Sequence, residues 1–323
     1  MIKYSTPGFS PGLDELIKAH QIIQPWIHRT PVFTNSWFNK KSGAELFFKC
    51  ENFQVSGSFK ARGAVHAVFR LSAQDAARGV ATHSSGNHAA ALSRAAGLRN
   101  IPAYIVMPEN APSVKVNGVK NYGGIIRFCE PVLEARETGL QEIVRATGAY
   151  FIPPYNHEHI ILGQASAALE LMQEVPGLDI IIAPVGGGGL LSGTSLAAKR
   201  LRPDITVYGA EPEQANDAFL SFKAGHIIPA NPDTIADGLR TSLGDITFGV
   251  IRTFTDDILT ASEAQIISSM RDVWERMKII IEPSCSVPLA AIASRPELFE
   301  GKKVGVILTG GNVDLDKLPW SPR

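Results

Sequence analysis

The sequence predicts an α/β fold built on parallel β-sheet, on the strength of three observations. Short, continuous apolar runs recur along the chain, and a stretch with helical character follows each of them. Strands that are apolar at every position are typical of a parallel sheet covered by helices on both faces. Several runs end in polar or glycine-rich loops that open the next helix, and ligands of open α/β sheets bind at these carboxyl ends.

The elements alternate from one end of the chain to the other. The clearest strands are ELFFKC, AYIVM, IIIAP, TVYGA and VGVIL, at residues 45–50, 103–107, 180–184, 206–210 and 304–308. The clearest helices cover residues 61–71, 89–96, 131–147 and 262–278. No internal repeat or low-complexity linker interrupts the alternation.

Composition excludes several classes of protein. The 323 residues, 45% hydrophobic and 19% charged, suffice for one large or two medium globular domains. Lys and Arg balance Asp and Glu at 31 each, so nothing favours nucleic acid or an anionic membrane as a partner. No apolar run reaches membrane-spanning length, and the N-terminus lacks a signal-peptide core. Three widely spaced cysteines favour a reducing compartment, so we expect a cytoplasmic protein.

A run of four glycines is the strongest local signal for a ligand. Gly186, Gly187, Gly188 and Gly189 follow the apolar run IIIAPV and precede a helix that starts near Leu190. Glycines let backbone N–H groups converge on an anion, and the following helix start adds partial positive charge. A merely flexible loop would carry a large entropic cost. The run therefore predicts a phosphate site.

A dinucleotide site is the competing interpretation of the same glycines. Glu211 lies 22 residues after Gly189 and resembles the acidic residue that anchors a ribose. The loop nevertheless departs from the GxGxxG pattern, because the sixth position counted from Gly187 is Ser192. It also lies in the middle of the chain, which disfavours this alternative.

Lys60 is placed unusually for a lysine. The sequence SGS at residues 56–58 indicates a turn and an N-cap, so that Lys60 falls in the first turn of the helix. A cation there opposes the helix dipole, which lowers its pKa and favours a nucleophilic amine. The alternative is a solvated surface lysine, as most lysines are.

The polar cluster HSSGNH at residues 83–88 opens an alanine-rich helix. Exposed N–H groups and hydroxyls at a helix start form a site for a carboxylate. The alternative is a simple N-cap without a ligand.

Together these loops resemble the serine racemase and threonine/serine dehydratase group of fold-type II pyridoxal-phosphate (PLP) enzymes. The matching text is ENFQVSGSFKARGA, THSSGNHAAALSRAA, PVGGGGLLSG, GAEPEQANDA, TIADGLRTSLG, WERMKIIIEPS and LTGGNVDL, from about residue 45 to 315. The resemblance implies two open, twisted, mostly parallel sheets with PLP in the cleft between them. It implies a large PLP-binding domain of residues 1–75 and 156–323, and a small mobile domain of residues 76–155.

The resemblance also implies which residues contact the cofactor. Lys60 would bind PLP as a Schiff base, with Phe59 beside the ring, and Asn87 would contact the ring oxygen O3′. Thr309 would face the pyridine nitrogen and leave it largely unprotonated, which favours loss of a β-leaving group. The remaining cofactor contacts would be Gly186, Gly187, Gly188, Gly189 and Leu190 for the phosphate, and Glu282 in WERMKIIIEPS.

For the reaction, the resemblance implies that Lys60 removes the Cα proton and that Ser85 works on the opposite face. The implied substrate contacts are His83, Ser84, Ser85, Gly86, Asn87, His88 and Arg136. Arg136 with His83 would receive a second carboxylate and so favour threo-3-hydroxyaspartate. A surface ion pair between Arg136 and Glu130 or Glu134 is the alternative.

A divalent cation is a further implication of the resemblance. Glu211, the Ala215 carbonyl and Asp217 match the family's cation site, and an all-oxygen ligand set suits Mg²⁺, Mn²⁺ or Ca²⁺. Without the resemblance, the same acidic residues would be read as a solvated surface.

The implied activity is a PLP-dependent dehydratase, or ammonia-lyase, acting on serine, threonine or threo-3-hydroxyaspartate. Serine racemase is the nearest alternative, followed by a β-replacement enzyme and a non-catalytic phosphate-ligand binder. We expect a small amino-acid substrate and a homodimer, and no regulatory domain after residue 309. A nucleotide effector is left open.

Overall fold

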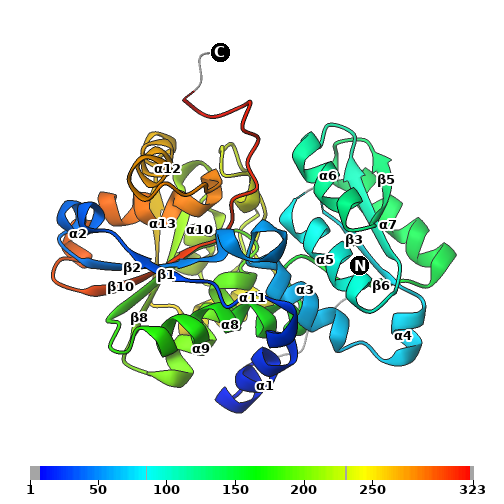
Figure 1. Cartoon of the computed structure of the whole chain (residues 1–323), viewed down its shortest axis with the longest axis horizontal. Helices are drawn as coiled ribbons and strands as arrows, with labels where there is room; N and C mark the ends of the chain where they lie inside the picture. The colour runs from blue at the N-terminus through cyan, green and yellow to red at the C-terminus, as the bar shows by residue number, and fades with distance from the viewer. Residues whose placement is uncertain (1–7, 85, 230, 321–323) are drawn as a thin grey trace.

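The computed structural model describes residues 8–84, 86–229 and 231–320, which form two separate β-sheets (Figure 1). The larger sheet has six strands, in the order β1 (Val32–Thr34), β2 (Glu45–Cys50), β10 (Lys303–Leu308), β7 (Ile180–Pro184), β8 (Thr206–Pro212) and β9 (Asp257–Ala261). Only its β1–β2 pair is antiparallel. The smaller sheet is wholly parallel, in the order β5 (Ile125–Cys129), β4 (Ala103–Pro108), β3 (Val80–His83) and β6 (Tyr150–Phe151). The predicted fold class is confirmed.

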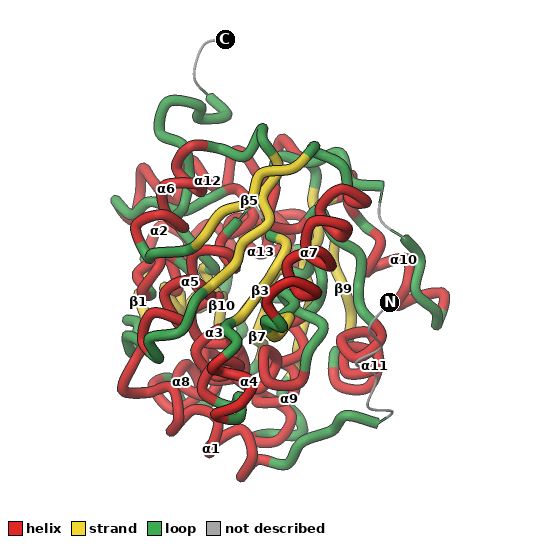
Figure 2. Tube along the Cα trace, turned by 90° about the vertical axis from the view of Figure 1, so that its right-hand side faces the viewer, coloured by secondary structure: helices red, strands yellow, loops and turns green. Residues whose placement is uncertain are grey.

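Helices cover both faces of each sheet. On the six-stranded sheet, one face packs against α2 (Ser36–Ser42), α12 (Glu263–Met277) and α13 (Pro283–Ser294), and the other against α8 (Glu158–Glu174), α9 (Gly189–Leu201), α10 (Asp217–Ala224) and α11 (Asp245–Phe254). On the four-stranded sheet, α5 (Asn87–Leu98) and α6 (Ser113–Asn121) lie opposite α7 (Leu133–Thr147). The remaining helices are α1 (Leu13–Ile23), α3 (Lys60–Phe69) and α4 (Ala73–Ala77). Figure 2 shows the four-stranded sheet from its outer side, with β5 and β3 towards the viewer.

The predicted element boundaries agree closely with the structure. The strands at 45–50 and 180–184 have the predicted limits. The helix predicted at 262–278 spans Glu263–Met277, because Ser262 and Gln265 form a capping box that fixes its start. The helix predicted from 131 begins only at Leu133. Local sequence signals therefore predicted the limits of an element wherever a helix cap or an apolar run was distinct.

Helix α3 lies at the junction of the two sheets, where it packs against both α5 and α8 (Figure 1). Its contact with α8 is very close, since a Cβ added to Gly163 would lie 2.6 Å from the carbonyl oxygen of Arg62. Lys60 is the first residue of this helix. The fold thus places Lys60 between the two sheets.

Candidate active site

Three loops meet at this junction and, together with helices α5 and α6, line a cavity of about 360 Å³. The side chain of Asn312 joins them, because its Nδ2 donates to the Ser56 carbonyl at 2.8 Å and to Asn87 Oδ1 at 2.9 Å. Asn87 Nδ2 in turn donates to Glu282 Oε1 at 2.7 Å. The loops before α3, before α5 and after β10 therefore converge, as the carboxyl ends of parallel strands should.

Lys60 extends from the start of α3 to the carbonyl oxygen of Pro154, to which its Nζ donates at 2.8 Å. Burial lowers the pKa of Lys60 to about 8, although the carboxylate of Glu282 partly opposes the shift. A useful fraction of the amine is therefore neutral near physiological pH. A nucleophilic or proton-accepting lysine needs this neutral form.

The turn before Lys60 differs in one respect from the expected turn and N-cap. Ser56 and Gly57 have φ angles of 63° and 73°, as a tight turn requires. Ser58, however, caps nothing, because its backbone bridges to Gly310 and its buried hydroxyl has no partner in the described part of the chain. Helix α3 thus begins without a side-chain cap, and other contacts must hold its first turn.

The glycine run forms the loop between β7 and α9. The N–H groups of Gly186, Gly187 and Gly188 donate to no described residue, so all three are free to bind an anion. A Cβ added to Gly187 would lie 2.3 Å from the ring of Tyr155, so only glycine fits there. Gly188 has a φ of 87° and forms the N-cap of α9. These features suit a phosphate at a helix start.

The other expected cofactor residues lie on neighbouring segments. Thr309 is buried directly after β10, and its carbonyl accepts a hydrogen bond from the Phe59 N–H at 3.0 Å. The Glu282 N–H donates to the Gly310 carbonyl at 3.0 Å, which ties the start of α13 to the same loop. Burial raises the pKa of Glu282 to about 7, and the charge of Asp237 adds to the shift. Glu282 therefore changes charge near neutral pH.

Two unpaired nitrogens mark the region of His83 and Arg136. His83 ends β3 and stacks on Phe151, and burial together with the charge of Arg136 lowers the pKa of its imidazole. His83 Nδ1 and Arg136 Nε are both buried without a hydrogen-bond partner in the described ranges. Arg136 forms no ion pair with Glu130 or Glu134, the alternative considered from the sequence.

The remaining residues of the 83–88 cluster open α5. Ser84 Oγ accepts from the Gly86 N–H at 3.4 Å, and Gly86 is the N-cap of the helix. The ring of His88 is buried beside the Ile152 carbonyl, 3.1 Å from its Nε2, and burial lowers the pKa of this histidine to about 3. The other ring nitrogen, Nδ1, is buried without a partner in the described part of the chain. Ser85 lies outside the described residues.

The expected cation ligands lie where β8 leads into α10. Glu211 accepts hydrogen bonds from the N–H groups of Ala218 and Phe219, at 3.1 and 2.9 Å. Both carboxylate oxygens of buried Asp217 lack a partner among the described residues. Burial raises the pKa of Glu211 and brings that of Asp217 to about 6. A divalent cation would supply the positive charge that two buried carboxylates need as a counter-ion. In the described ranges no three His, Cys, Asp or Glu side chains cluster as metal ligands, and the third expected ligand, Ala215, would use its carbonyl.

Sequence reasoning missed some residues that the fold brings to the cavity or into contact with the expected site residues. Lys115 of α6 lines it and forms an ion pair with Asp237 of the six-stranded part. Pro154 and Tyr155 contact Lys60 and the glycine loop. Only Asn312 carried a signal, since it stands in the LTGGNVD turn. Lys115, Pro154 and Tyr155 lie outside every quoted motif.

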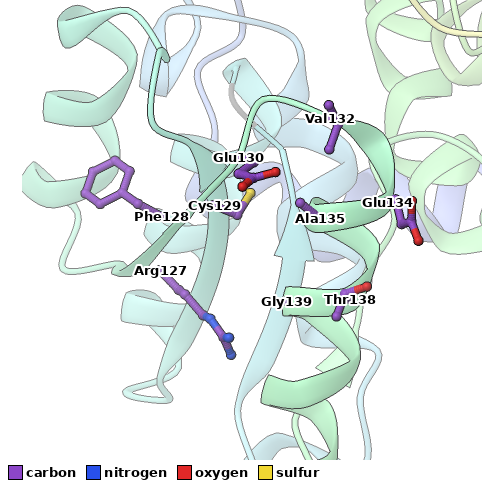
Figure 3. A pocket seen from close by; sticks show the side chains of 9 residues that line it. All are labelled: Arg127, Phe128, Cys129, Glu130, Val132, Glu134, Ala135, Thr138 and Gly139. Carbon is purple, nitrogen blue, oxygen red and sulfur yellow. The ribbon is translucent and has the colours of Figure 1, made fainter.

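A second hollow, of about 390 Å³, lies between β5 and the start of α7 (Figure 3). It is lined by Arg127, Phe128, Cys129, Glu130, Val132, Glu134, Ala135, Thr138 and Gly139. None of these is an expected site residue, so we do not assign this hollow to the reaction. Among the helices in the described ranges, none is long and apolar enough to span a membrane.

The chain is similar to known proteins along nearly its whole length. A family model described as "Pyridoxal-phosphate dependent enzyme" matches residues 23–310. A beta-hydroxyaspartate dehydratase of Paracoccus denitrificans is 51% identical over 314 residues, covering 97% of this chain and 100% of the relative. A serine racemase of Dictyostelium discoideum is 48% identical, covering 97% of this chain and 98% of the relative. A crystal structure of serine racemase from Dictyostelium discoideum superposes with a TM-score of 0.90, covering 94% of this chain and 99% of that one.

Proposed function

Because the chain belongs to the family of pyridoxal-phosphate dependent enzymes, we propose that it is a dehydratase, or ammonia-lyase, for β-hydroxy amino acids. The preferred substrate in this proposal is threo-3-hydroxyaspartate, and the smaller amino acids serine and threonine are also substrates. The products are a keto acid, oxaloacetate for hydroxyaspartate, and ammonia. The water lost in the elimination is returned when the resulting enamine, as its imine, is hydrolysed, so the net change is loss of ammonia.

The site fits the cofactor. The free N–H groups of Gly186, Gly187 and Gly188, with Gly189 and Leu190 at the start of α9, would hold its phosphate. Lys60 would bind it covalently, and Phe59, Asn87, Glu282 and Thr309 would surround its ring. PLP bound there withdraws electrons from the substrate's Cα and so acidifies the Cα proton.

The chain's own groups divide the remaining work. With PLP bound, the amine of Lys60 would accept the Cα proton, and the Pro154 carbonyl, 2.8 Å from Nζ, would accept a hydrogen bond from the resulting ammonium. The substrate's α-carboxylate would dock at the start of α5, on residues 84–88.

The substrate assignment rests on two buried nitrogens, His83 Nδ1 and Arg136 Nε, which have no hydrogen-bond partner among the described residues. A buried guanidinium nitrogen without a partner is costly, and a carboxylate on the substrate side chain would satisfy it. Serine and threonine lack this second carboxylate. The name of the Paracoccus relative, beta-hydroxyaspartate dehydratase, supports the assignment.

Serine racemase is the second candidate, because the Dictyostelium relative carries that name. The two activities would share the cofactor residues and Lys60, and differ in whether Ser85 returns a proton to the opposite face of Cα. Chiral analysis of serine after incubation separates them. Formation of D-serine without keto acid would overturn the dehydratase proposal.

A divalent cation at Glu211, Ala215 and Asp217 belongs to the same proposal, supported by the unpaired carboxylate of Asp217. Mg²⁺, Mn²⁺ or Ca²⁺ should raise the melting temperature of the wild-type protein. The same ions should leave Asp217→Asn unaffected, and an equal rise in that variant would refute the site.

The proposal includes two domains that close on the substrate. All strands of the four-stranded sheet fall within residues 76–155, and all strands of the six-stranded sheet fall within residues 1–75 and 156–323. The three cysteines are unpaired, which supports a reducing cytoplasmic setting. We also expect a homodimer, which a solution measurement of molar mass would test.

Lys60→Ala is the test of the proposed function. We expect the variant to lose both the visible absorbance of lysine-bound PLP, near ~410–420 nm in such enzymes, and all turnover. The exposed Lys302→Ala, at the turn before β10, is the control and should keep both. Retention of absorbance and turnover in Lys60→Ala would remove the basis of the proposal. A phosphate-ligand binder without a Schiff base would lack the band in the wild type as well, and a β-replacement enzyme would need a second nucleophilic substrate.

A further inference from the structure

A network of buried charges lies behind Lys60 and takes no part in the mechanism above. It consists of Lys49 at the end of β2, Glu51 directly after it, Arg62 of α3 and Glu170 of α8. Their side chains are 0%, 0%, 0% and 1% exposed. Two cations face two anions, so the network has no net charge.

Arg62 uses all five of its N–H groups in this network. Towards Glu51, Nε donates to Oε2 at 2.6 Å and Nη2 to Oε1 at 2.7 Å. Towards Glu170, Nη1 donates to Oε1 at 2.9 Å and Nη2 to Oε2 at 2.8 Å. The fifth bond joins Nη1 to Ser166 Oγ at 3.0 Å. Because the guanidinium is planar, these paired contacts with two carboxylates fix both its position and its orientation.

The carboxylates are held as firmly from the other side. Lys49 Nζ lies 2.7 Å from Glu170 Oε2 and also donates to the Thr30 carbonyl at 2.7 Å. Thr30 Oγ1 donates to Glu51 Oε1 at 2.5 Å. Burial would raise the pKa of Glu170, but its contacts with Arg62 and Lys49 lower it instead, so this carboxylate stays ionised.

Stability alone gives a weak reason for such a network. Removing four charged groups from water costs several kcal/mol per ion, and replacing a buried ion cluster with apolar residues is often neutral or stabilising. The benefit of a fully paired network is a unique geometry. The question is which part of the molecule needs that geometry.

The first turn of α3 is that part. It begins without a side-chain cap, and its first residue is a cation placed against the helix dipole. Arg62, two residues after Lys60, fastens the turn to the end of β2 and to α8. Close packing of Gly63 and Gly163 leaves the two helices no space in which to shift.

The geometry points to Arg62 as a positioning residue for Lys60: its forked contacts with Glu51 and Glu170 hold the first turn of α3, so that the lysine stays aimed at the reacting carbon while it is free of the cofactor. This inference rests on the proposed role of Lys60. We expect the network to act through geometry, because it has no net charge and the carboxylate that raises the pKa of Lys60 is Glu282, outside the network.

The test compares three variants. Arg62→Lys keeps the charge and loses the fork, and Ser166→Ala removes one of the five bonds and no charge. Val273→Ala creates a cavity in α12, far from α3, and serves as a control for general destabilisation. Each variant is examined by hydrogen exchange of the backbone amides at residues 60–64, with and without PLP, and by kcat and KM.

We expect Arg62→Lys to exchange these amides faster, in the cofactor-free protein as well, and to lower kcat at least about tenfold with KM within about twofold. Ser166→Ala should show a smaller effect in the same direction. Val273→Ala should lower the melting temperature without changing exchange at residues 60–64 or kcat. If Arg62→Lys behaves like Val273→Ala, the network is only structural and the inference is wrong.

The exchange measurement needs no substrate. An incorrect substrate assignment would therefore leave this test intact, and a failure of the inference would leave the proposed function standing.

Discussion

At the scale of single residues, the site is governed by burial of groups that normally carry charge. Lys60 is desolvated at the junction of the sheets, and burial raises the pKa of Glu282 nearby to about 7. Each group depends on the other, since the Glu282 carboxylate stabilises the ammonium form of Lys60. The protonation of the lysine can therefore be changed through its neighbour.

Glu282→Gln tests this coupling. The amide keeps the shape and can still accept from Asn87, but it removes the negative charge that raises the pKa of Lys60. Only the neutral amine attacks PLP, so the rate at which the cofactor-free protein combines with PLP should rise as pH passes the pKa of Lys60, about 8 in the wild type. In the variant the midpoint should move to lower pH, by between a few tenths and about one unit.

Stopped-flow absorbance across pH measures this midpoint. Glu300→Gln, at an exposed position before β10, is the control and should leave the midpoint unchanged. An upward shift, or none, in Glu282→Gln would show that Glu282 is not the charge that acts on Lys60.

At the scale of elements, the expected site residues lie mainly in strand-to-helix loops, and the glycine loop between β7 and α9 is tightly packed. A Cβ on Gly187 would overlap the ring of Tyr155 at 2.3 Å, well inside van der Waals contact. Either the ring or the loop must then move, and a shift of the loop would displace the free N–H groups that are proposed to bind the phosphate.

Gly187→Ala should therefore weaken PLP binding at least about tenfold, or ~1.4 kcal/mol. Gly249→Ala is a matched control, because its Cβ would meet nothing within 4 Å in the middle of α11. It should leave the Kd of PLP unchanged and stabilise the protein by up to about 1 kcal/mol. Titration of the cofactor-free proteins with PLP gives both values, and equal affinities in the two variants would contradict the role of the loop.

Elements were also the scale at which the sequence predicted most. Apolar runs such as ELFFKC define β2, and the Ser262–Gln265 capping box defines the start of α12, because both are local signals. Lys60 and the glycines stood out for the same reason, since their immediate neighbours are unusual. Ser58 showed the limit of local evidence: it resembles an N-cap, but pairing with Gly310 takes its backbone out of that role.

The buried network shows the limit more plainly. Arg62 and Glu170 are 108 residues apart and each looks like a surface charge in its own segment. The same holds for Lys115 and Asp237, which meet only when the two sheets come together. Contacts of this kind depend on the tertiary fold, and no pattern in one sequence reveals them.

At the scale of the whole molecule, the two sheets carry different groups of expected site residues on either side of their junction. The six-stranded part carries the glycine loop and Glu282, with Lys60 on α3 beside it, and the four-stranded part carries Asn87, His83 and Arg136. In this account the first group serves the reaction and the second selects the substrate. The specificity should therefore be separable from the chemistry by mutation.

The most direct measurement is a kinetic panel of L-serine, D-serine, L-threonine and both enantiomers of threo-3-hydroxyaspartate, with keto acid and serine chirality followed together. The PLP-loaded wild type should release oxaloacetate from hydroxyaspartate with a higher kcat/KM than pyruvate from serine. Arg136→Ala should lower kcat/KM for hydroxyaspartate at least about tenfold, the worth of one charged hydrogen bond, and leave serine within about threefold. Arg127→Ala removes an exposed arginine of β5 that pairs with Glu142 of α7, and it should change neither kcat/KM. Absence of keto acid from every substrate, or an equal loss for hydroxyaspartate and serine in Arg136→Ala, would contradict the account.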